Sequence, residues 1–136
     1  MFGIDTNILV RHLVQDSKTQ AALAQELIEK RCSSEEPAVI SLIVLCETVW
    51  VLSRAYGYSR EQIVVVLRQI LLTDCFDIEE HAQAWDALYD YQAGMADYAD
   101  CLMVRLNRAR GCRTTFTFDR KAARLNGFTL LAKNSM

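Results

Sequence analysis

The chain has 136 residues, of which 51% are hydrophobic and 24% charged. This length and balance fit one folded domain with its own core and exclude a disordered or fibrous protein. No apolar run reaches the ~18 residues of a membrane helix. The N-terminal Met-Phe-Gly-Ile-Asp lacks the basic start and apolar stretch of a signal peptide. We therefore expect a single domain over residues 1–136, in the cytoplasm and without membrane contact.

The net charge of −2 conceals an uneven distribution of charge along the chain. Residues 1–100 hold 7 basic and 16 acidic side chains, whereas residues 101–136 hold 8 basic side chains and a single acid, Asp119. A basic segment can bind a polyanion, because Lys and Arg displace the counterions condensed on phosphates. A solvated helix face or a surface for an acidic protein would have the same composition, so charge alone leaves these three readings open.

The five cysteines are widely and irregularly spaced, and no Cys-x-x-Cys pair occurs. This spacing predicts neither a zinc site nor a redox motif. We expect buried free thiols, as in a reducing compartment.

Strands and helices are predicted to alternate along the chain. In order, we expect a strand over residues 2–5, a helix over 7–14, a helix capped by Ser17, a strand over 37–41, a helix over 42–56, a helix capped by Ser59 and running to about Leu72, a strand over 75–78, helices over 80–92 and 97–110, a strand over 114–118, a short helix over 119–125 and a strand over 128–131. This alternation favours a parallel sheet covered by helices on both faces.

Two acidic residues lie at the carboxyl ends of predicted strands. Asp5 ends the first strand, and Asp119 follows Thr-Thr-Phe-Thr-Phe. The carboxyl ends of strands line the ligand crevice of an open parallel sheet, so both carboxylates are placed to reach a metal ion. Each is equally well placed to cap the helix that comes next.

Three further acids lie in predicted helices. Glu47 is the only charge between Pro37 and Ser53, and its helical neighbours include Ile43 and Trp50, so we expect its face to be packed. A carboxylate there needs a cation, an Arg partner or a helix edge at the surface. Asp97 and Asp100 share a face at the start of a helix, where the helix dipole favours negative charge. Asp97 suits the N-cap and Asp100 the third helical position, which favours Asp100 as the primary ligand and Asp97 as a helper.

Together, Asp5, Glu47, Asp100 and Asp119 indicate a metal site. Carboxylates do not cluster without a cation, because like charges raise each other's pKa. Hard oxygen ligands select Mg²⁺ or Mn²⁺. No Cys or His cluster competes for this role, and we interpret His12 and His81, which adjoin no motif, as structural or surface residues.

Four sequence motifs in this order resemble the PIN-domain nucleases, and among them the VapC-type toxins of bacterial toxin–antitoxin pairs. The motifs are Ile4-Asp5-Thr6-Asn7-Ile8, Ile40-Ser41-Leu42 followed by Glu47, Ala96-Asp97-Tyr98-Ala99-Asp100-Cys101-Leu102, and Thr117-Phe118-Asp119-Arg120. The likeness covers essentially the whole chain. The chain departs from the family pattern at Met103-Val-Arg105 and in the charges of Arg108 and Arg110.

The resemblance implies a Rossmann-like three-layer α/β/α sandwich with a central, mainly parallel sheet. It also implies a Mg²⁺- or Mn²⁺-dependent endoribonuclease with one or two ions. By position, Asp5, Glu47, Asp100 and Asp119 match the acidic quartet of the family, and Asp97 matches a frequent extra acid. Thr6, Asn7 and Thr117 match polar residues that support the site.

Single-stranded RNA is the substrate we expect, because its backbone bends into a narrow acidic site. Tyr98 is either a base-stacking residue or a core aromatic. The residues predicted to hold the RNA backbone are Arg105, Arg108, Arg113, Arg120 and Lys121.

The expected protein partners are a small antitoxin encoded next door and a second copy of the chain. The apolar residues 63–72 and the helix that begins at Leu42 offer surface for either, although core packing must claim most of them. Two rival functions remain at this stage. One is a non-catalytic module that holds RNA or protein; the other is a phosphatase or receiver-type domain, in which Glu47 would have no role.

Overall fold

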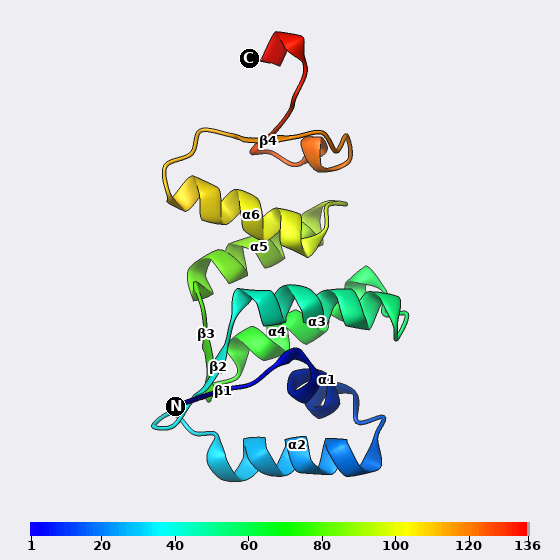
Figure 1. Cartoon of the computed structure of the whole chain (residues 1–136), viewed down its shortest axis with the longest axis vertical. Coiled ribbons are helices and arrows are strands. Elements are labelled where there is room, and N and C mark those ends of the chain that lie inside the picture. The colour runs from blue at the N-terminus through cyan, green and yellow to red at the C-terminus, as the bar shows by residue number, and fades with distance from the viewer. Residues whose placement is uncertain (136) are drawn as a thin grey trace. The chain divides into compact units, whose positions relative to one another are not determined.

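The computed structural model describes residues 1–135 (Figure 1). The chain divides into two compact units, one formed by Met1–His81 and the other beginning at Ala82. Each unit combines helices with parallel strands. Among the described residues, no helix is both long and apolar enough to cross a membrane.

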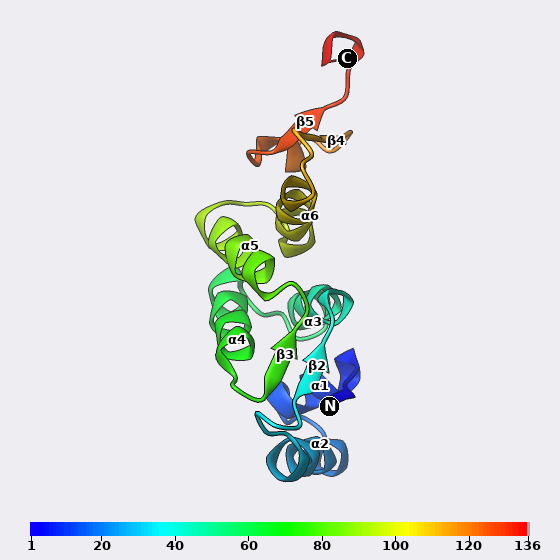
Figure 2. The same ribbon diagram turned by 90° about the vertical axis from the view of Figure 1, so that its left-hand side faces the viewer.

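The first unit contains a parallel sheet with strand order β1-β2-β3. Its strands are β1 (Phe2–Gly3), β2 (Ala38–Ile40) and β3 (Phe76–Ile78), and its helices are α1 (Thr6–Val14), α2 (Lys18–Arg31), α3 (Leu42–Arg54) and α4 (Arg60–Leu72). Ala38 is in register with Phe2 on one side and with Phe76 on the other. Figure 2 shows β2 and β3 side by side.

Helix packing closes the core of the first unit. Helix α1 contacts α2 and α3, and α3 contacts α4. Leu9, Ile40 and Leu45 are fully buried, and each removes apolar surface from water worth roughly 1.5–3 kcal/mol. Cys32 ties the end of α2 to the start of β3, because its thiol lies 2.9 Å from the carbonyl oxygen of Cys75.

Helix α4 begins where its sequence predicts. The Ser59 hydroxyl accepts a hydrogen bond from the Gln62 amide at 3.2 Å, and the Gln62 side chain accepts one from the Ser59 amide at 2.8 Å. This reciprocal pair satisfies two amides that the first helical turn leaves without partners. The register of α4 then buries Ile63, Leu67 and Ile70.

The second unit packs two helices together and adds a two-stranded parallel ladder. Its elements are α5 (His81–Ala93, which starts at the last residue of the first unit), α6 (Tyr98–Ala109), β4 (Thr115–Thr117), the 3₁₀ turn η1 (Ala122–Arg124), β5 (Phe128–Leu130) and the 3₁₀ turn η2 (Lys133–Ser135). Tyr98 is 1% exposed, donates a hydrogen bond to the carbonyl of Ala84 at 2.9 Å and packs edge-on against Tyr91. Tyr98 is therefore a core aromatic and does not stack on a base.

The structure confirms an α/β fold with parallel strands, and each predicted strand and helix is present. The segment after Asp119 forms a 3₁₀ turn over Ala122–Arg124 only, shorter than the predicted helix. The expectation of buried thiols holds for Cys101 alone; Cys112 is exposed, and the other three are half-buried. The single domain over residues 1–136 stays a prediction.

Gly127 lies close against helix α6 in the second unit. Its φ of +114° disfavours L side chains, and a Cβ atom there would lie 2.5 Å from Cγ1 of Val104 and 2.8 Å from Nη2 of Arg108. The Gly127 carbonyl also accepts a hydrogen bond from the Thr115 amide at 2.9 Å, next to the β4–β5 ladder. The absence of a side chain at Gly127 therefore lets β5 lie against α6.

We predict that Gly127→Ala lowers the free energy of unfolding by about 2–4 kcal/mol, the sum of overpacking and backbone strain. Gly57→Ala is the control, since Gly57 also has a positive φ but, within residues 1–135, no atom beyond its own chain neighbours lies within 4 Å of the position that its Cβ would take. Strain alone should cost about 1–2 kcal/mol in the control. Urea unfolding measures both, and equal losses would show that the contact with α6 does not matter.

Candidate metal and RNA site

Asp5 lies between β1 and α1 and caps the helix. Its Oδ1 accepts a hydrogen bond from the amide of Ile8 at 3.0 Å, and its side chain is exposed. Asp5 is therefore the N-cap of α1, one of the two roles predicted for it from the sequence. Among residues 1–135, no hydrogen bond reaches Oδ2 of Asp5, so one carboxylate oxygen remains open to a cation.

A pocket of about 420 Å³ adjoins Asp5 and is lined partly by Asn7, Arg11 and Leu23. The Arg11 guanidinium does not neutralise Asp5, because it pairs with Asp16 at 2.6 Å. Thr6 is the first residue of α1. Thr6 and Asn7 thus lie in the first turn of α1, next to Asp5, and their supporting role stays a prediction.

Glu47 lies in the middle of α3, and its surroundings contradict the sequence-based expectation. Helix α3 buries Val44, Leu45, Thr48 and Leu52. Ile43, Glu47 and Trp50 fall on the opposite side, where Ile43 is 70% and Trp50 63% exposed. The prediction that the face carrying Glu47 is packed is wrong. The helix is apolar on all sides, and its register turns one apolar side to the core and the side with Glu47 to solvent.

Glu79 is an acid at a strand end that sequence reasoning missed. It follows β3, as Asp5 follows β1, and its Oε1 accepts a hydrogen bond from the Leu42 amide at 2.9 Å. Its own amide donates to the carbonyl of Ile40 at 3.0 Å. Glu79 thereby fixes the start of α3, the helix that carries Glu47. Its position at the end of a predicted strand, the feature that identified Asp5, could have identified Glu79 as well.

Helix α6 begins as predicted, with Asp97 at the N-cap and Asp100 in the first turn. Within the described residues, the Asp97 side chain makes no capping hydrogen bond, and its carboxylate is exposed. Asp100 is half-buried. Asp97 therefore occupies the N-cap position of α6, but its carboxylate oxygens are not used to cap the helix.

Two carboxylates of the second unit, Asp97 and Asp119, act on a third, Asp100. Burial raises the pKa of Asp100, and the negative charges of Asp97 and Asp119 raise this pKa further. The ammonium of Lys121 lowers it. Burial is the main cause of the raised pKa of Asp100, and the two neighbouring carboxylates add to it, so the charged form of Asp100 is disfavoured in the absence of a cation.

Asp119 is held in a tight turn after β4. Its amide donates to the hydroxyl of Thr117 at 3.0 Å, and its Oδ1 accepts from the amide of Lys121 at 2.8 Å. Within the chain as far as residue 135, Oδ2 of Asp119 has no hydrogen-bond donor. Like Asp5, Asp119 caps a turn with one oxygen and presents the other.

The predicted metal ligands divide between the two units: Asp5 and Glu47 lie in the first, and Asp97, Asp100 and Asp119 lie in the second. Carboxylate oxygens are the ligands that Mg²⁺ and Mn²⁺ prefer, so the donor set fits either ion. In the described part of the chain, no three acidic, Cys or His side chains already lie close enough together to hold an ion. Convergence of all four acids stays a prediction.

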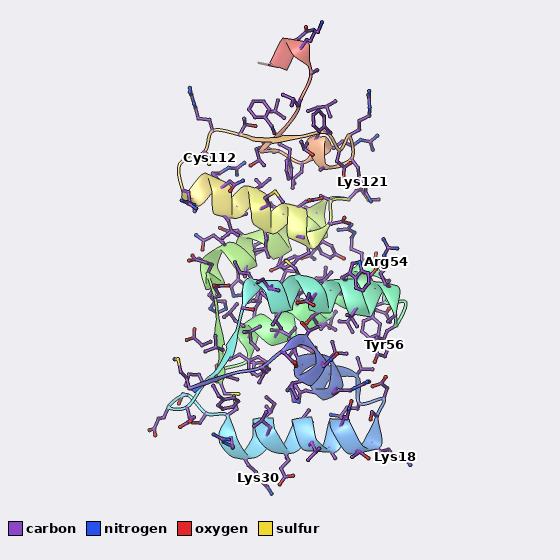
Figure 3. All side chains as sticks on the ribbon, viewed as in Figure 1. Lys18, Lys30, Arg54, Tyr56, Cys112 and Lys121 are labelled. Carbon is purple, nitrogen blue, oxygen red and sulfur yellow. The ribbon has the colours of Figure 1, made fainter. Side chains whose placement is uncertain are left out.

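The basic residues predicted to hold RNA differ in the hydrogen bonds that they already make within the chain. Arg105 pairs with Asp90 through two hydrogen bonds of 2.7 and 2.9 Å, which tie α6 to α5. Arg108 donates to the carbonyl of Asn126 at 3.3 Å. Figure 3 shows Lys121 near the N-terminal end of α6 and Cys112 near its opposite end. The remaining predicted residues, Arg113 and Arg120, are exposed.

Both histidines have structural surroundings. His12 is half-buried, its ring meets Phe76 edge-on, and burial lowers its pKa. A ring nitrogen of His81 lies 2.9 Å from the carbonyl oxygen of Leu71. His12 is thus a structural residue, whereas His81 is exposed, and both fall within the prediction of structural or surface residues.

The chain belongs to the PIN domain family, whose sequence profile matches residues 3–127. This confirms the family inferred from the four motifs. A VapC ribonuclease of Aquifex aeolicus (strain VF5) is 24% identical over 122 residues, a stretch that covers 90% of each chain. Among solved structures, Mycobacterium tuberculosis VapC20, described as a Sarcin-Ricin loop cleaving toxin, is 19% identical and matches with a TM-score of 0.46. The match covers 93% of this chain and 96% of that one.

We predict that Asp100→Asn stabilises the metal-free protein at neutral pH. Because the pKa of Asp100 is raised by folding, the folded state keeps this proton to a higher pH than the unfolded chain, and stability falls as pH rises above ~4. Removing the ionisable group should raise Tm in EDTA at pH ~7 by on the order of 1–3 °C, a small effect because the carboxyl is partly solvated.

The gain in Tm should vanish at pH ~3, where the carboxyl is protonated in both states. Asp86→Asn is the matched control, since Asp86 is exposed on α5 and is not among the charges that shift the pKa of Asp100. Equal Tm values for the wild type and Asp100→Asn at both pH values would contradict the electrostatic account.

Proposed function

We propose that this protein is a Mg²⁺- or Mn²⁺-dependent endoribonuclease that hydrolyses RNA phosphodiester bonds, and that it is the toxin of a toxin–antitoxin pair. The observation that carries the proposal is the half-buried Asp100 carboxylate, on which the charges of Asp97 and Asp119 both act, in a chain of the PIN domain family. Side chains that repel one another at one end of a helix are suited to share a cation. The ribonuclease name of the Aquifex aeolicus relative supports RNA as the substrate.

In this proposal, Asp5, Glu47, Asp100 and Asp119 hold one or two divalent ions, with Asp97 as an additional acid. The bound cation would supply Lewis acidity for phosphodiester hydrolysis. Thr117 orients Asp119 through its backbone amide, and the cap at Ile8 orients Asp5. Glu79 orients α3 and thereby Glu47. Thr6 and Asn7 complete the polar support around Asp5.

RNA contact in this proposal comes from exposed cations of the second unit. Arg113, Arg120 and Lys121 are exposed, and Lys121 is close enough to Asp100 to affect its pKa. Arg108 can contribute because its guanidinium makes only a 3.3 Å bond to a carbonyl. Arg105 is the least suited of the predicted residues, because RNA would have to displace Asp90 from a bidentate pair.

The rival reading, a non-catalytic module that holds RNA or protein, lacks such support. A module that only binds RNA gains nothing from repelling carboxylates, since they also repel phosphate. Requirement for a divalent ion separates the two readings, because only the nuclease needs the ion for its effect on RNA.

We predict that the protein cleaves unstructured RNA with Mg²⁺ or Mn²⁺ and that EDTA abolishes cleavage. Asp5→Asn, Glu47→Gln, Asp100→Asn and Asp119→Asn should each lower the rate by about 100-fold or more, as expected on loss of a metal ligand. Asp86→Asn should keep the wild-type rate. Gel analysis of a labelled RNA measures all of these. Cleavage that persists in EDTA, or in both Asp5→Asn and Asp100→Asn, would exclude the mechanism.

We also propose a cytoplasmic protein that pairs with a small antitoxin and forms a homodimer. Exposed apolar side chains such as Trp50, Val65 and Leu72 offer contact area for such partners. We predict that the product of the neighbouring gene, co-expressed with an affinity tag, co-purifies this chain and suppresses its RNA cleavage. A co-expressed product that leaves cleavage unchanged would contradict the pairing, and light scattering of the isolated chain tests the dimer.

A further inference from the structure

A pocket of about 360 Å³ lies within the second unit, beside the acids of α6. It is formed between the segment that joins α5 to α6 and the η1 turn. Residues of the first segment include Met95, and residues of the second include Lys121, Arg124 and Leu125. The volume lies in the range of pockets that hold small ligands, about 300–1,000 Å³.

The charge in this pocket is positive. Asp90 also lines it, but the Asp90 carboxylate is bound by the guanidinium of Arg105. Throughout residues 1–135, neither Lys121 nor Arg124 makes an ion pair within 4.0 Å. Two cations that no carboxylate of the described residues pairs within 4.0 Å, next to a carboxylate that Arg105 neutralises, favour an anionic ligand.

The pocket combines this charge with an apolar wall. Met95 is 69% exposed and lines the pocket together with Leu125. A thioether and an aliphatic side chain pack against the face of a flat ring, and the pocket also includes Asn126, whose amide can pair with ring nitrogen or carbonyl groups. A phosphate joined to a flat heterocycle, which is a nucleotide, matches both parts.

Lys121 connects the pocket with the candidate metal site. Lys121 lines the pocket, its positive charge acts on the carboxylate of Asp100, and its backbone amide donates a hydrogen bond to Asp119. A phosphate held by Lys121 is therefore bound by a residue that also interacts with two of the candidate metal ligands.

We propose that this pocket is a nucleotide subsite of the ribonuclease, in which Lys121 and Arg124 bind a phosphate of single-stranded RNA and Met95 and Leu125 contact the attached base. This inference rests on the proposed function and adds to it a place where one nucleotide beside the cleaved bond is held. Arg124 becomes an RNA-contacting residue that the sequence did not single out.

The test measures RNA binding separately from cleavage. The parent protein is Asp100→Asn, which keeps the pocket, in buffer with Mg²⁺. The probe is a short fluorescein-labelled single-stranded RNA of mixed sequence, followed by anisotropy over a series of salt concentrations. The test variant adds Lys121→Ala and Arg124→Ala. The control adds Arg110→Ala and Lys133→Ala, which remove the same charge from exposed positions outside the pocket.

We expect the test variant to bind about 10-fold or more weakly. Its plot of log K against log salt should be shallower by about 0.7, since each phosphate neutralised on a single strand contributes about 0.7 and both residues hold one phosphate. The control should stay within about 2-fold of the parent at physiological salt, where distant charges are screened. Lys121→Arg with Arg124→Lys, which keeps both charges, should restore most of the affinity.

Unchanged affinity and slope in the test variant, equal losses in test and control, or a parent that binds no RNA would each overturn the subsite. Circular dichroism checks that the variants fold. Cleavage by the wild type is scored independently: an intact binding pattern without cleavage would support the subsite and refute the nuclease, whereas cleavage with unchanged binding in the test variant would do the reverse.

Discussion

Electrostatic repulsion between carboxylates is the interaction on which the candidate site depends. Asp100, half-buried in the first turn of α6, is disfavoured in its charged form by burial and by the charges of Asp97 and Asp119, and Lys121 opposes this effect only in part. The helix N-terminus contributes a further favourable potential, although it is confined to the first turn. A site built this way holds an excess of negative charge in the folded chain, which a cation relieves and a proton relieves in its absence.

Capping and ligation are compatible at this site because a carboxylate has two oxygens. Asp5 and Asp119 each use Oδ1 to accept hydrogen bonds from amides that follow them in the chain. These bonds fix the orientation of the side chain before any ligand arrives. The sequence presented capping and metal binding as alternatives, but in the structure one oxygen of each carboxylate makes the cap while Oδ2 accepts no hydrogen bond within residues 1–135, so capping leaves an oxygen for the proposed ion.

Local signals were sufficient for the elements of the fold. Ser59 to Gln62 predicted the start of α4, and the position of Asp97 predicted the start of α6, because capping depends on residues within one turn. The strand ends that carry Asp5 and Asp119 were predictable for the same reason. The family could be inferred because four short motifs occur in a fixed order.

Features that depend on distant partners were not predictable from the sequence. The orientation of α3 was misjudged because an apolar run on all sides contains no period to reveal which face is buried. Arg105 was read as an RNA contact since its partner, Asp90, lies 15 residues away on another helix. Glu79 escaped notice because its carboxylate caps a helix that precedes it by 37 residues.

The contact of Gly127 with α6 has a consequence for how members of this family diverge. The connection from Asp119 to Asn126 is anchored at one end by β4 and at the other by a glycine pressed against Val104 and Arg108. A crossover pinned at both ends tolerates exchange of its side chains far better than insertion or deletion. Substitutions along this segment can therefore change the surface that it presents while Asp119 at its start keeps its place.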